Sequence, residues 1–432
     1  MAALIARTRR GADPRPHRAG KARAGLLRAL AGGAAAALAL AACTPGGDAR
    51  TAQPGPSGDG VLRIGLLLDN EGESAYLNDA QLAAVVLAVQ EANAAGGHAG
   101  KPVELLDAEP SADTGAAARR LVEAGADVVI GPTDSSRAPA AIDVLAHAKV
   151  TLISPANTST PLSSYPSSGF YFRTTAAEAA EGAALVELAR QSGARSVAVL
   201  NQAGSRGKAV ADGAKAALGA AGLEDAGSAE FRGHDAAAAA LGAQEADAVA
   251  VVAHDGGPAI LAQLAEAGLS GGRLVLSDGL VGRYGSALAA RSLEGARVVV
   301  PGVFPSAEFQ TAILGQDEDL TDMAFAAEAY DAAALAILAA AVAEDDAGAS
   351  IASRLTAVSG GDPGTGSPDR TDCTGLPACL ELARAGRAVD YEGQSGPVAF
   401  DGHGDITTAR FMVLRFGADN LPKVDGEVTV AR

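Results

Sequence analysis

Short apolar runs alternate with amphipathic stretches along this chain from Val61 onward. This alternation is the pattern of a parallel sheet whose strands are joined by helical crossovers. The first pair is an expected strand over 61–68 and an expected helix over 79–95, followed by Gly96-Gly97, where glycine can take the left-handed conformation that ends a helix. The sequence therefore predicts an α/β fold with doubly wound sheets.

The expected strands and helices fall into two series. One runs over 61–153 and the other over 176–276. Beyond Pro301 the pattern changes to long helices, notably over 321–344. Three segments with alternating side chains close the chain and are predicted as antiparallel edge strands: 397–400, 409–416 and 424–430. Two lobes are the economical interpretation.

An internal similarity supports two lobes. The sequence AGADVVIGPTDSSRAPAAIDVLA parallels EADAVAVVAHDGGPAILAQLA about 120 residues later, and Asp127 and Asp247 open corresponding strands. Pro139 and Pro258 lie at corresponding helix starts. The spacing is too long for a solenoid repeat and fits duplication of a whole lobe. Chance likeness between two units rich in Ala and Val is the alternative.

The N-terminus has the features of an export signal. A basic stretch precedes an uncharged run over 29–42, which is too short to span a bilayer as a permanent helix but suits a signal peptide. The sequence LAAC resembles the lipobox of bacterial lipoproteins, which implies that Cys43 is lipidated and becomes the first mature residue. The alternative is a secretory signal with an incidental cysteine. We expect a signal peptide over 1–42 and, because the next residues are rich in Gly, Pro and Ser, a flexible tether over 43–60.

Two cysteines remain after Cys43. Cys373 and Cys379 lie in the sequence CTGLPAC. An even pair in an exported chain is most simply a disulfide. A metal or redox site is the weaker alternative, because the spacing is not CxxC and no histidine lies nearby.

The charge of the chain excludes one class of partner. The sequence has 34 Lys and Arg against 51 Asp and Glu, for a net charge of -17, and its N-terminal stretch is basic, so the remainder is more acidic still. An acidic body repels a phosphate backbone, and no basic cluster accompanied by aromatic residues offsets that repulsion. We therefore expect no nucleic-acid binding.

An exported hydrolase is the alternative from a different class. The sequence has no GxSxG and no HExxH, so neither a serine triad nor a zinc site is indicated. The stretch GSRGK at 204–208 imitates part of a phosphate loop, but Ala209 stands where such a loop needs Ser or Thr. A pair of catalytic carboxylates stays open in a chain with so many acids. We expect no catalytic residue, no metal and no cofactor.

Several longer motifs follow one another in order: IGLLLDNEGESAYLNDAQLAA, EANAAGGHAGKPVELL, ADVVIGPTDSS with LISPANTST, FYFRTTAAEAAEGAAL, AYDAAALAI and EGQSGPVAFDGHGDI. No single motif is decisive, but their order and spacing are specific. Together they resemble the type 1 periplasmic substrate-binding proteins, specifically the branched-chain amino acid (Leu/Ile/Val) binding family of ABC importers, over roughly residues 62–413. The resemblance implies two Rossmann-like lobes joined by a three-strand hinge, with the ligand in the cleft between them.

The resemblance also implies that each lobe is assembled from separate segments of the chain. By that analogy the first lobe takes 61–172 and 303–362. The second lobe takes 173–302 and 363–432. The ligand is then captured when the two lobes close about the hinge.

Two loops are expected to hold a carboxylate of the ligand. In doubly wound sheets, ligands bind beyond the carboxyl ends of the strands, where loops lead into helix N-termini. The loops GPTDSS and SPANT each follow an expected strand, and both are similar to the family loops that hold an α-carboxylate. The resemblance carries that role onto Ser135, Ser136, Ala156, Asn157 and Thr158. Ordinary N-capping by Ser, Asn and Thr is the alternative for either loop alone.

An amino-acid ligand also needs a carboxylate opposite its ammonium group, because an unpaired, desolvated cation is costly. Asp278 lies where the family places such an acid, although an Asp-Gly turn would explain it as well. Tyr76 lies in the first strand-to-helix loop, where the family often has an aromatic over the ligand; a surface tyrosine is the alternative. Arg206 departs from the tyrosine common in branched-chain binders, and His254 lies where an aromatic is expected. Arg206 either pairs with a second anionic group of the ligand or points into water.

These features together predict a monomeric, extracytoplasmic protein that is lipid-anchored to the outer face of the cell membrane. It is expected to capture an amino acid or a related small polar solute and to present it to ABC permease subunits in that membrane. It is not expected to be an enzyme. A ligand-sensing receptor or amide-regulator domain of the same fold is the alternative, and we prefer the importer because no transmembrane helix or partner domain follows the lobes in the sequence.

Overall fold

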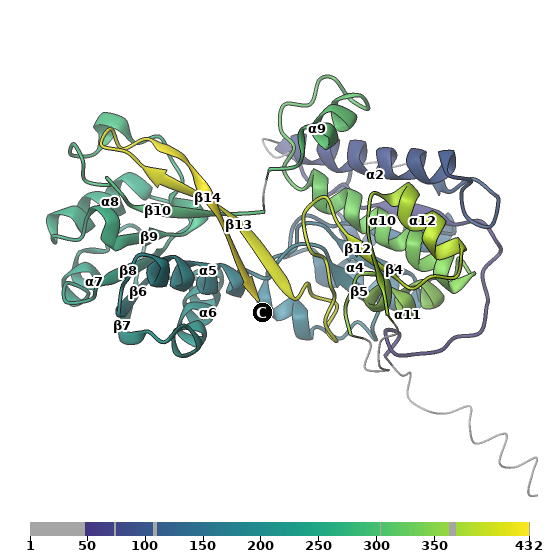
Figure 1. Ribbon diagram of the computed structural model, residues 1–432, viewed down its shortest axis with the longest axis horizontal. Helices are drawn as coiled ribbons and strands as arrows, with labels where there is room; N and C mark the ends of the chain where they lie inside the picture. The colour runs from purple at the N-terminus through teal and green to yellow at the C-terminus, as the bar shows by residue number, and fades with distance from the viewer. Residues whose placement is uncertain (1–47, 73–74, 107–109, 303, 363–368, 432) are drawn as a thin grey trace, which may run out of the picture. The chain divides into compact units, whose positions relative to one another are not determined.

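Figure 1 shows the computed structural model of the chain, which describes residues 48–431 except 73–74, 107–109, 303 and 363–368. The expected signal peptide and Cys43 lie outside the described residues. Two large sheets, each covered by helices, form the cores of two lobes. The predicted α/β class with doubly wound sheets is confirmed.

The first lobe is built on a five-stranded parallel sheet in the order β2-β1-β3-β4-β5. Its strands are β1 (Arg63–Leu66), β2 (Glu104–Leu105), β3 (Val128–Ile130), β4 (Thr151–Ser154) and β5 (Tyr171–Arg173). The three residues of β3 are fully buried, as the continuous apolar run VVI predicts for a strand covered on both faces. The carboxyl ends of these strands lie at one edge, so the loops that follow them are neighbours.

Helices cover both faces of this sheet. They are α2 (Tyr76–Ala94), α3 (Thr114–Glu123), α4 (Ala138–Ala148), α9 (Ala307–Leu314), α10 (Ala326–Ala343), α11 (Gly348–Val358) and α12 (Leu376–Arg384). Side chains of α3 and α4 share one apolar core with the sheet, and side chains of the other five share a second core. Of the described helices, α10 alone is long and apolar enough to cross a membrane, but it contacts α2, α11 and α12 and is mostly buried. Its composition is that of a core helix.

The second lobe is built on a seven-stranded sheet in the order β14-β13-β10-β9-β8-β6-β7. Its strands are β6 (Ser196–Gln202), β7 (Glu224–Phe231), β8 (Ala248–Val252), β9 (Leu274–Leu276), β10 (Arg297–Pro301), β13 (Thr408–Phe416) and β14 (Pro422–Ala431). The first five are mutually parallel, whereas β13 is antiparallel to both β10 and β14. Two of the three predicted edge strands are thus β13 and β14, but 397–400 makes only isolated bridges and is not a strand.

Four helices cover the second sheet. They are α5 (Glu178–Gln191), α6 (Ser205–Ala221), α7 (Ala237–Gly242) and α8 (Gly257–Glu266). The backbones of α5 and α6 approach closely because glycine lies at the contact in both helices. A Cβ added to Gly182 would lie 2.1 Å from the Val210 carbonyl oxygen, and one added to Gly213 would lie 2.1 Å from that of Ala179.

The internal similarity of the sequence has a counterpart in the two lobes. In the first lobe, the Asp127 carboxylate accepts a hydrogen bond of 2.9 Å from the backbone N–H of Arg63. In the second lobe, the Asp247 carboxylate accepts one of 2.9 Å from the backbone N–H of Arg195. A proline also lies in the first turn of both α4 and α8. Equivalent strand starts and helix starts are what duplication of a lobe would leave.

The chain passes between the lobes three times: from β5 to α5, from β10 to α9, and shortly before β13. We expected the last return near residue 363, but 371–400 instead belongs to the first lobe. Its strands β11 (Thr371–Thr374) and β12 (Val389–Glu392) pair only with each other, and α12 packs on α2 and α10. The apolar side chains of this segment are needed to cover α10, so the chain returns to the second sheet only at β13.

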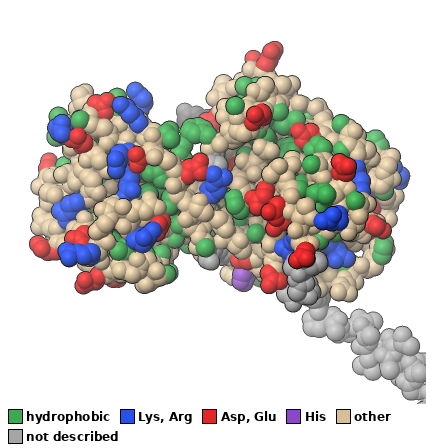
Figure 2. Space-filling model, viewed as in Figure 1, with side chains coloured by type: hydrophobic (Ala, Val, Ile, Leu, Met, Phe, Trp, Pro, Cys, Tyr) green, Lys and Arg blue, Asp and Glu red, His purple; other side chains and the backbone are tan. Residues whose placement is uncertain are grey.

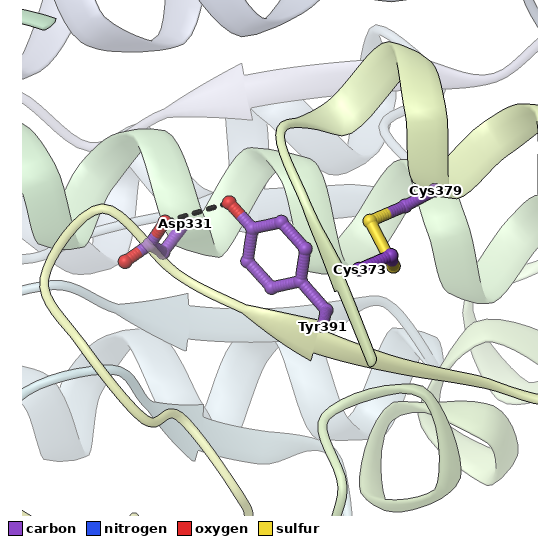
Figure 3. Close-up of a disulfide and its surroundings, with 4 residues drawn as sticks. All are labelled: Asp331, Cys373, Cys379 and Tyr391. Atoms are coloured by element: carbon purple, nitrogen blue, oxygen red, sulfur yellow. Dashed lines mark hydrogen bonds between the residues drawn. A yellow bond between two sulfur atoms is a disulfide. The ribbon is translucent and has the colours of Figure 1, made fainter. Parts of the chain in front are cut away.

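Figure 3 shows the disulfide between Cys373 and Cys379, which joins β11 to α12 inside the first lobe. Beside it, the Tyr391 hydroxyl donates a hydrogen bond of 2.8 Å to Asp331 of α10. The buried Asp331 carboxylate also accepts from the backbone N–H of Ser395 at 2.8 Å. The motifs AYDA and EGQSG, far apart in the sequence, therefore meet at this carboxylate.

The described residues before β1 are not the flexible tether that we expected. Ala49 and Arg50 are buried in the first lobe, and backbone N–H groups over 57–61 donate to two aspartates after α10. Glycine and proline keep this segment out of helices and strands, and backbone N–H groups of its residues other than proline pair with carboxylates instead. The expected tether over 43–60 is therefore wrong for 48–60.

Candidate functional site

Loops that follow β1, β3, β4 and β5 meet at the carboxyl edge of the first sheet. Asp69, in the loop after β1, is 2% exposed. Its carboxylate accepts hydrogen bonds from the backbone N–H groups of Thr133 at 2.8 Å and Asp134 at 3.0 Å. The first N–H groups of the GPTDSS loop are thus already paired inside the protein. Sequence reasoning missed Asp69, although an acid directly after the apolar run LLL was a usable signal.

The side chain of Asn157 holds together the loop after β3 and the loop after β4. Its side chain is fully buried, and its amide group donates to the carbonyl oxygens of Pro132 and Thr133 at 3.0 Å each. Its amide oxygen accepts a hydrogen bond of 3.2 Å from the Tyr171 hydroxyl. The side chain therefore joins the loop after β4 to the loop after β3.

The other predicted residues of these loops lie nearer to solvent. The Ser135 hydroxyl accepts a hydrogen bond of 3.3 Å from the backbone N–H of Ser159, so the structure brings the two loops into contact. Ser136 is exposed, Thr158 is half-buried and Ala156 is buried. Side chains that can face a solute are therefore available from both loops.

A buried ion pair fixes the loop after β4. Arg173, at the end of β5, is fully buried and binds the Asp405 carboxylate through two hydrogen bonds of 2.6 and 3.0 Å. Its guanidinium also donates to the carbonyl oxygens of Asn157 at 2.9 Å and Ser159 at 3.0 Å. Sequence reasoning missed this pair, because nothing local connects Arg173 with a residue so far along the chain.

Tyr76, which was expected to cover the ligand, is the first residue of α2. Its side chain is 40% exposed. It therefore lies at the start of the helix, which begins earlier than the expected 79, and not in the preceding strand-to-helix loop.

The second lobe brings Arg206 and Asp278 together in an ionic cluster. Arg206, at the start of α6, places one guanidinium nitrogen 2.8 Å from both carboxylate oxygens of Asp278. The same nitrogen lies 2.9 Å from the carboxylate of Glu181, and Glu178 lies 3.9 Å from the guanidinium. Glu181 in turn accepts from the backbone N–H of Asp278 at 2.8 Å. Arg206 therefore pairs with carboxylates of the protein, which neither of the sequence-based alternatives anticipated.

The two glutamates of α5 add carboxyl groups beside the pair of Arg206 and Asp278. The Glu181 side chain is 2% exposed, and burial, together with the neighbouring Asp278 carboxylate, raises the pKa of Glu181 to about 8. One guanidinium faces three carboxyl groups, so the cluster carries no surplus positive charge for an anion. It offers a favourable environment for a cation instead.

A cavity of about 430 Å³ lies beside the segments that cross between the lobes. Asp278 lines it from the second lobe and Glu328, in the first turn of α10, lines it from the first lobe. Most of the remaining lining is apolar and comprises Val300, Pro301, Phe304, Pro305, Met323, Ala324, Phe325, Ala327 and Met412. Burial raises the pKa of Glu328 to about 7. Such a cavity suits a solute with an apolar body and a cationic group.

Sequence reasoning found only part of this cavity. Of the predicted site residues, Asp278 lines it, whereas those of the GPTDSS and SPANT loops are not among its lining residues. Glu328 was missed, although an acid within the apolar stretch AAEAYDA was a usable signal.

Figure 2 shows one face of the molecule, on which Lys and Arg side chains are scattered among Asp and Glu side chains. They do not gather into one basic patch on this face.

Comparison with known proteins places this geometry in context. A family model described as periplasmic binding protein matches residues 61–409. None of the curated proteins matches the sequence.

Solved structures with the same fold are numerous. The branched-chain amino acid transporter substrate binding protein LivJ from Streptococcus pneumoniae, in complex with isoleucine, is 22% identical, with a TM-score of 0.57 over 86% of this chain and 100% of that one. A branched-chain amino acid ABC transporter protein from Rhodospirillum rubrum is 20% identical, with a TM-score of 0.64 over 84% and 99%. An ABC transporter solute binding protein from R. palustris, in complex with benzoate, is 18% identical, with a TM-score of 0.53 over 86% and 98%.

Proposed function

Because the chain belongs to the periplasmic binding protein family, we propose that it is the solute-binding component of an ABC importer. The observation that carries the proposal is the cavity beside the crossing segments, which receives Asp278 from one lobe and Glu328 from the other. A solute held by both lobes would be enclosed when they close about these segments, without any chemical step. The protein would then present the closed form to permease subunits in the membrane.

The ligand that the cavity supports best is an amino acid or a related small polar solute with an apolar side chain. Its ammonium group would lie between Asp278 and Glu328, and its side chain would lie against the phenylalanines and methionines of the cavity. Desolvating a cation beside carboxylates is favourable, whereas a carboxylate placed there would be repelled.

A carboxylic acid without an ammonium group is the second candidate, and one observation favours it. Asp278 is already paired with Arg206 at 2.8 Å, so a ligand cation is not required to balance its charge. Some proteins with this fold are complexed with benzoate or hydroxybenzoates.

For the first lobe, we propose that Ser135, Ser136 and Thr158 contact the carboxylate of the ligand and that Tyr76 covers it. The backbone of Ala156 would contribute beside them. Asn157 would act through its support of the loops, because its own side chain is fully buried.

We also propose that Cys43 carries the lipid anchor, so that the monomeric protein stays on the outer face of the cell membrane. The LAAC sequence after an uncharged run supports this. Mass spectrometry of the N-terminal peptide from the exported protein tests it, and a peptide without lipid on Cys43 would contradict it.

Thermal unfolding of the protein with matched ligands tests the proposed function. We compare leucine with 4-methylpentanoate, which lacks the ammonium group, and with 3-methylbutylamine, which lacks the carboxylate, and we add benzoate. A ligand at 100 times its Kd adds about 2.7 kcal/mol to the free energy of unfolding and should raise the Tm by at least about one or two degrees. A rise with leucine alone supports the amino acid, and a rise with benzoate or 4-methylpentanoate supports the carboxylic acid.

A pair of variants locates the site. Asp278→Asn should lower the affinity for the ligand by at least about tenfold if Asp278 contacts the ligand. Asp212→Asn is the matched control, because Asp212 is exposed on α6 and pairs with Lys208. Equal affinity of the ligand for Asp278→Asn and for the control would show that Asp278 does not contact the ligand.

A further inference from the structure

The segment Asp48–Val61 runs along the first lobe and is called the strap here. At its start, the backbone N–H of Ala49 donates to the Ser168 carbonyl at 2.9 Å, and Ala49 is 4% exposed. This close approach requires glycine at position 169, where a Cβ would lie 2.4 Å from the Ala49 nitrogen. The beginning of the strap is therefore seated in the lobe.

Arg50 fastens the strap next to two of the crossing segments. Its guanidinium donates to the carbonyl oxygens of Tyr171 at 2.5 Å and His403 at 2.7 Å. It also lies 5.0 Å from the centre of the Phe172 ring and pairs with Asp48 at 3.2 Å. Arg50 is 8% exposed, so a charged side chain has been buried to make these contacts.

The end of the strap is fastened to the loop after α10. The backbone N–H of Gly58 donates to the Asp345 carboxylate at 2.9 Å, and that of Val61 donates to Asp346 at 2.7 Å. The strap is thus fixed at both ends, and all these partners belong to the first lobe.

We propose that the strap fixes the first lobe against the membrane, with the face around Asp48, Ser168 and His403 next to the lipid surface. This inference rests on the proposed lipid anchor at Cys43. Only residues 44–47 separate Cys43 from Asp48, so the two are at most about 18 Å apart. If 43–60 were a flexible tether, the lobe could move as far as about 60 Å from the anchor.

A fixed first lobe has a consequence for ligand capture. Because the strap is fastened to the first lobe, closure about the crossing segments moves the second lobe relative to the membrane. The lipid surface is therefore the partner of one face of the first lobe, and the second lobe remains free to swing.

Energy transfer on vesicles tests the proposal with the full lipidated chain. The vesicles contain phosphatidylcholine, phosphatidylglycerol and a lipid-linked acceptor, and the donor is placed on His403→Cys or on Leu241→Cys. His403 is exposed on the proposed membrane face, and Leu241, in α7 of the second lobe, is 60% exposed. We expect the transfer efficiency from position 403 to be at least about twice that from 241, given the short span to the anchor.

A length variant and a strap variant complete the test. A Gly-Ser insertion of about 20 residues after Gly47 should lower the transfer from position 403 towards the value at 241, because a flexible linker loosens the constraint. Arg50→Ala should lower it partly and should speed hydrogen exchange at the Ala49 amide. Arg190→Ala, which removes an exposed side chain paired with Glu187 on α5 of the second lobe, is the control and should change neither.

The outcomes separate the inference from the function on which it rests. If the protein does not bind vesicles, the lipid anchor is wrong and the membrane inference fails with it. If it binds vesicles but positions 403 and 241 give equal transfer, the anchor stands and the inference is overturned. Rapid exchange at Ala49 in the unaltered protein would likewise overturn it.

Discussion

Arg206 and Asp278, 72 residues apart in the sequence, are joined in the second lobe, with one guanidinium nitrogen 2.8 Å from both carboxylate oxygens. Glu181 binds both partners from below, accepting from the Arg206 side chain and from the Asp278 backbone. Asp278, which lines the cavity from the second lobe, is therefore held in an ionic cluster, and a ligand that contacts Asp278 must compete with this cluster or complement it.

Replacing Arg206 should change both stability and ligand choice. Arg206→Gln leaves Glu181 and Asp278 without their cation, so we expect a loss of about 1–3 kcal/mol in the free energy of unfolding, measured with denaturant. Affinity for an ammonium-bearing ligand should rise several-fold, because a competing cation is gone. Lys208→Gln, at an exposed pair on the same helix, should change stability by less than about 0.5 kcal/mol. If Arg206→Gln bound an ammonium-bearing ligand more weakly than the wild type, our interpretation of the cluster would be contradicted.

The raised pKa of Glu181 predicts a pH dependence of stability. An acid whose pKa rises on folding, here from 4.5 to about 8, binds more protons in the folded than in the unfolded state between those values. Its contribution to stability is therefore full below pH 4.5 and is lost as the pH rises to about 8. Over this pH window, the free energy of unfolding should fall less in Glu181→Gln than in the wild type. The difference should be at least about 1.4 kcal/mol, the equivalent of one pKa unit. Identical pH profiles from denaturant titrations would show that Glu181 ionises normally.

The pair of Arg173 and Asp405 should matter more for stability than any exposed pair. Arg173→Met removes the guanidinium that binds the buried Asp405 carboxylate, which costs about 3–5 kcal/mol. Arg190→Met removes the exposed pair with Glu187 and should cost at most about 1 kcal/mol. Chemical denaturation of both variants measures the difference. Equal losses would mean that Asp405 finds another partner.

Glu328 should make ligand binding depend on pH if the ligand carries a cation. Burial raises the pKa of Glu328 to about 7, so the carboxylate forms mainly between pH 6 and pH 8. Affinity for a cationic ligand should then rise over that range by up to about tenfold. In Glu328→Gln the rise should be smaller, whereas Asp322→Asn, an exposed neighbour in the same cavity, should keep it. Calorimetric titrations at three pH values measure this, and a wild-type affinity that is flat with pH would argue for a ligand without a cation.

The disulfide should stabilise the first lobe modestly. Cys373 and Cys379 are separated by six positions, so the closed loop is short and its entropic effect is about 2 kcal/mol. The Cys373→Ser, Cys379→Ser double variant should lose that amount and should become insensitive to reducing agent. A wild-type midpoint that does not move on reduction would show that the bond contributes nothing.

The elements that the sequence predicted well are those in which one segment carries its own signal. The apolar run VVI is β3, and the alternation over 409–416 is in β13. Strands β5 and β10 were not among the expected elements. Each lies directly before a segment that crosses between the lobes, and β5 is also short. The return of the chain to the second sheet was misplaced for a related reason: residues 371–400 fold with the lobe whose core they cover.

For the site, local patterns identified residue types but not their partners. The loop containing Ser135 and the position of Asp278 were identified from the sequence, whereas Asp69, Arg173, Glu181 and Glu328 were not. Asn157 was named as a ligand contact, and its side chain lies instead beneath the loops.

The sequence by itself determined the α/β class, most strands and helices of the two series over 61–153 and 176–276, the division into two lobes and the acidic character of the chain. These depend on the spacing of apolar residues and on composition, which are properties of neighbouring residues. Only the tertiary structure decided that Arg206 is neutralised within the protein, that Arg173 binds a residue 232 positions away, and that the strap lies on the first lobe. Burial makes such pairs necessary, because a desolvated charge must find a partner, but any of many acids in this chain could have served until the fold brought one within reach.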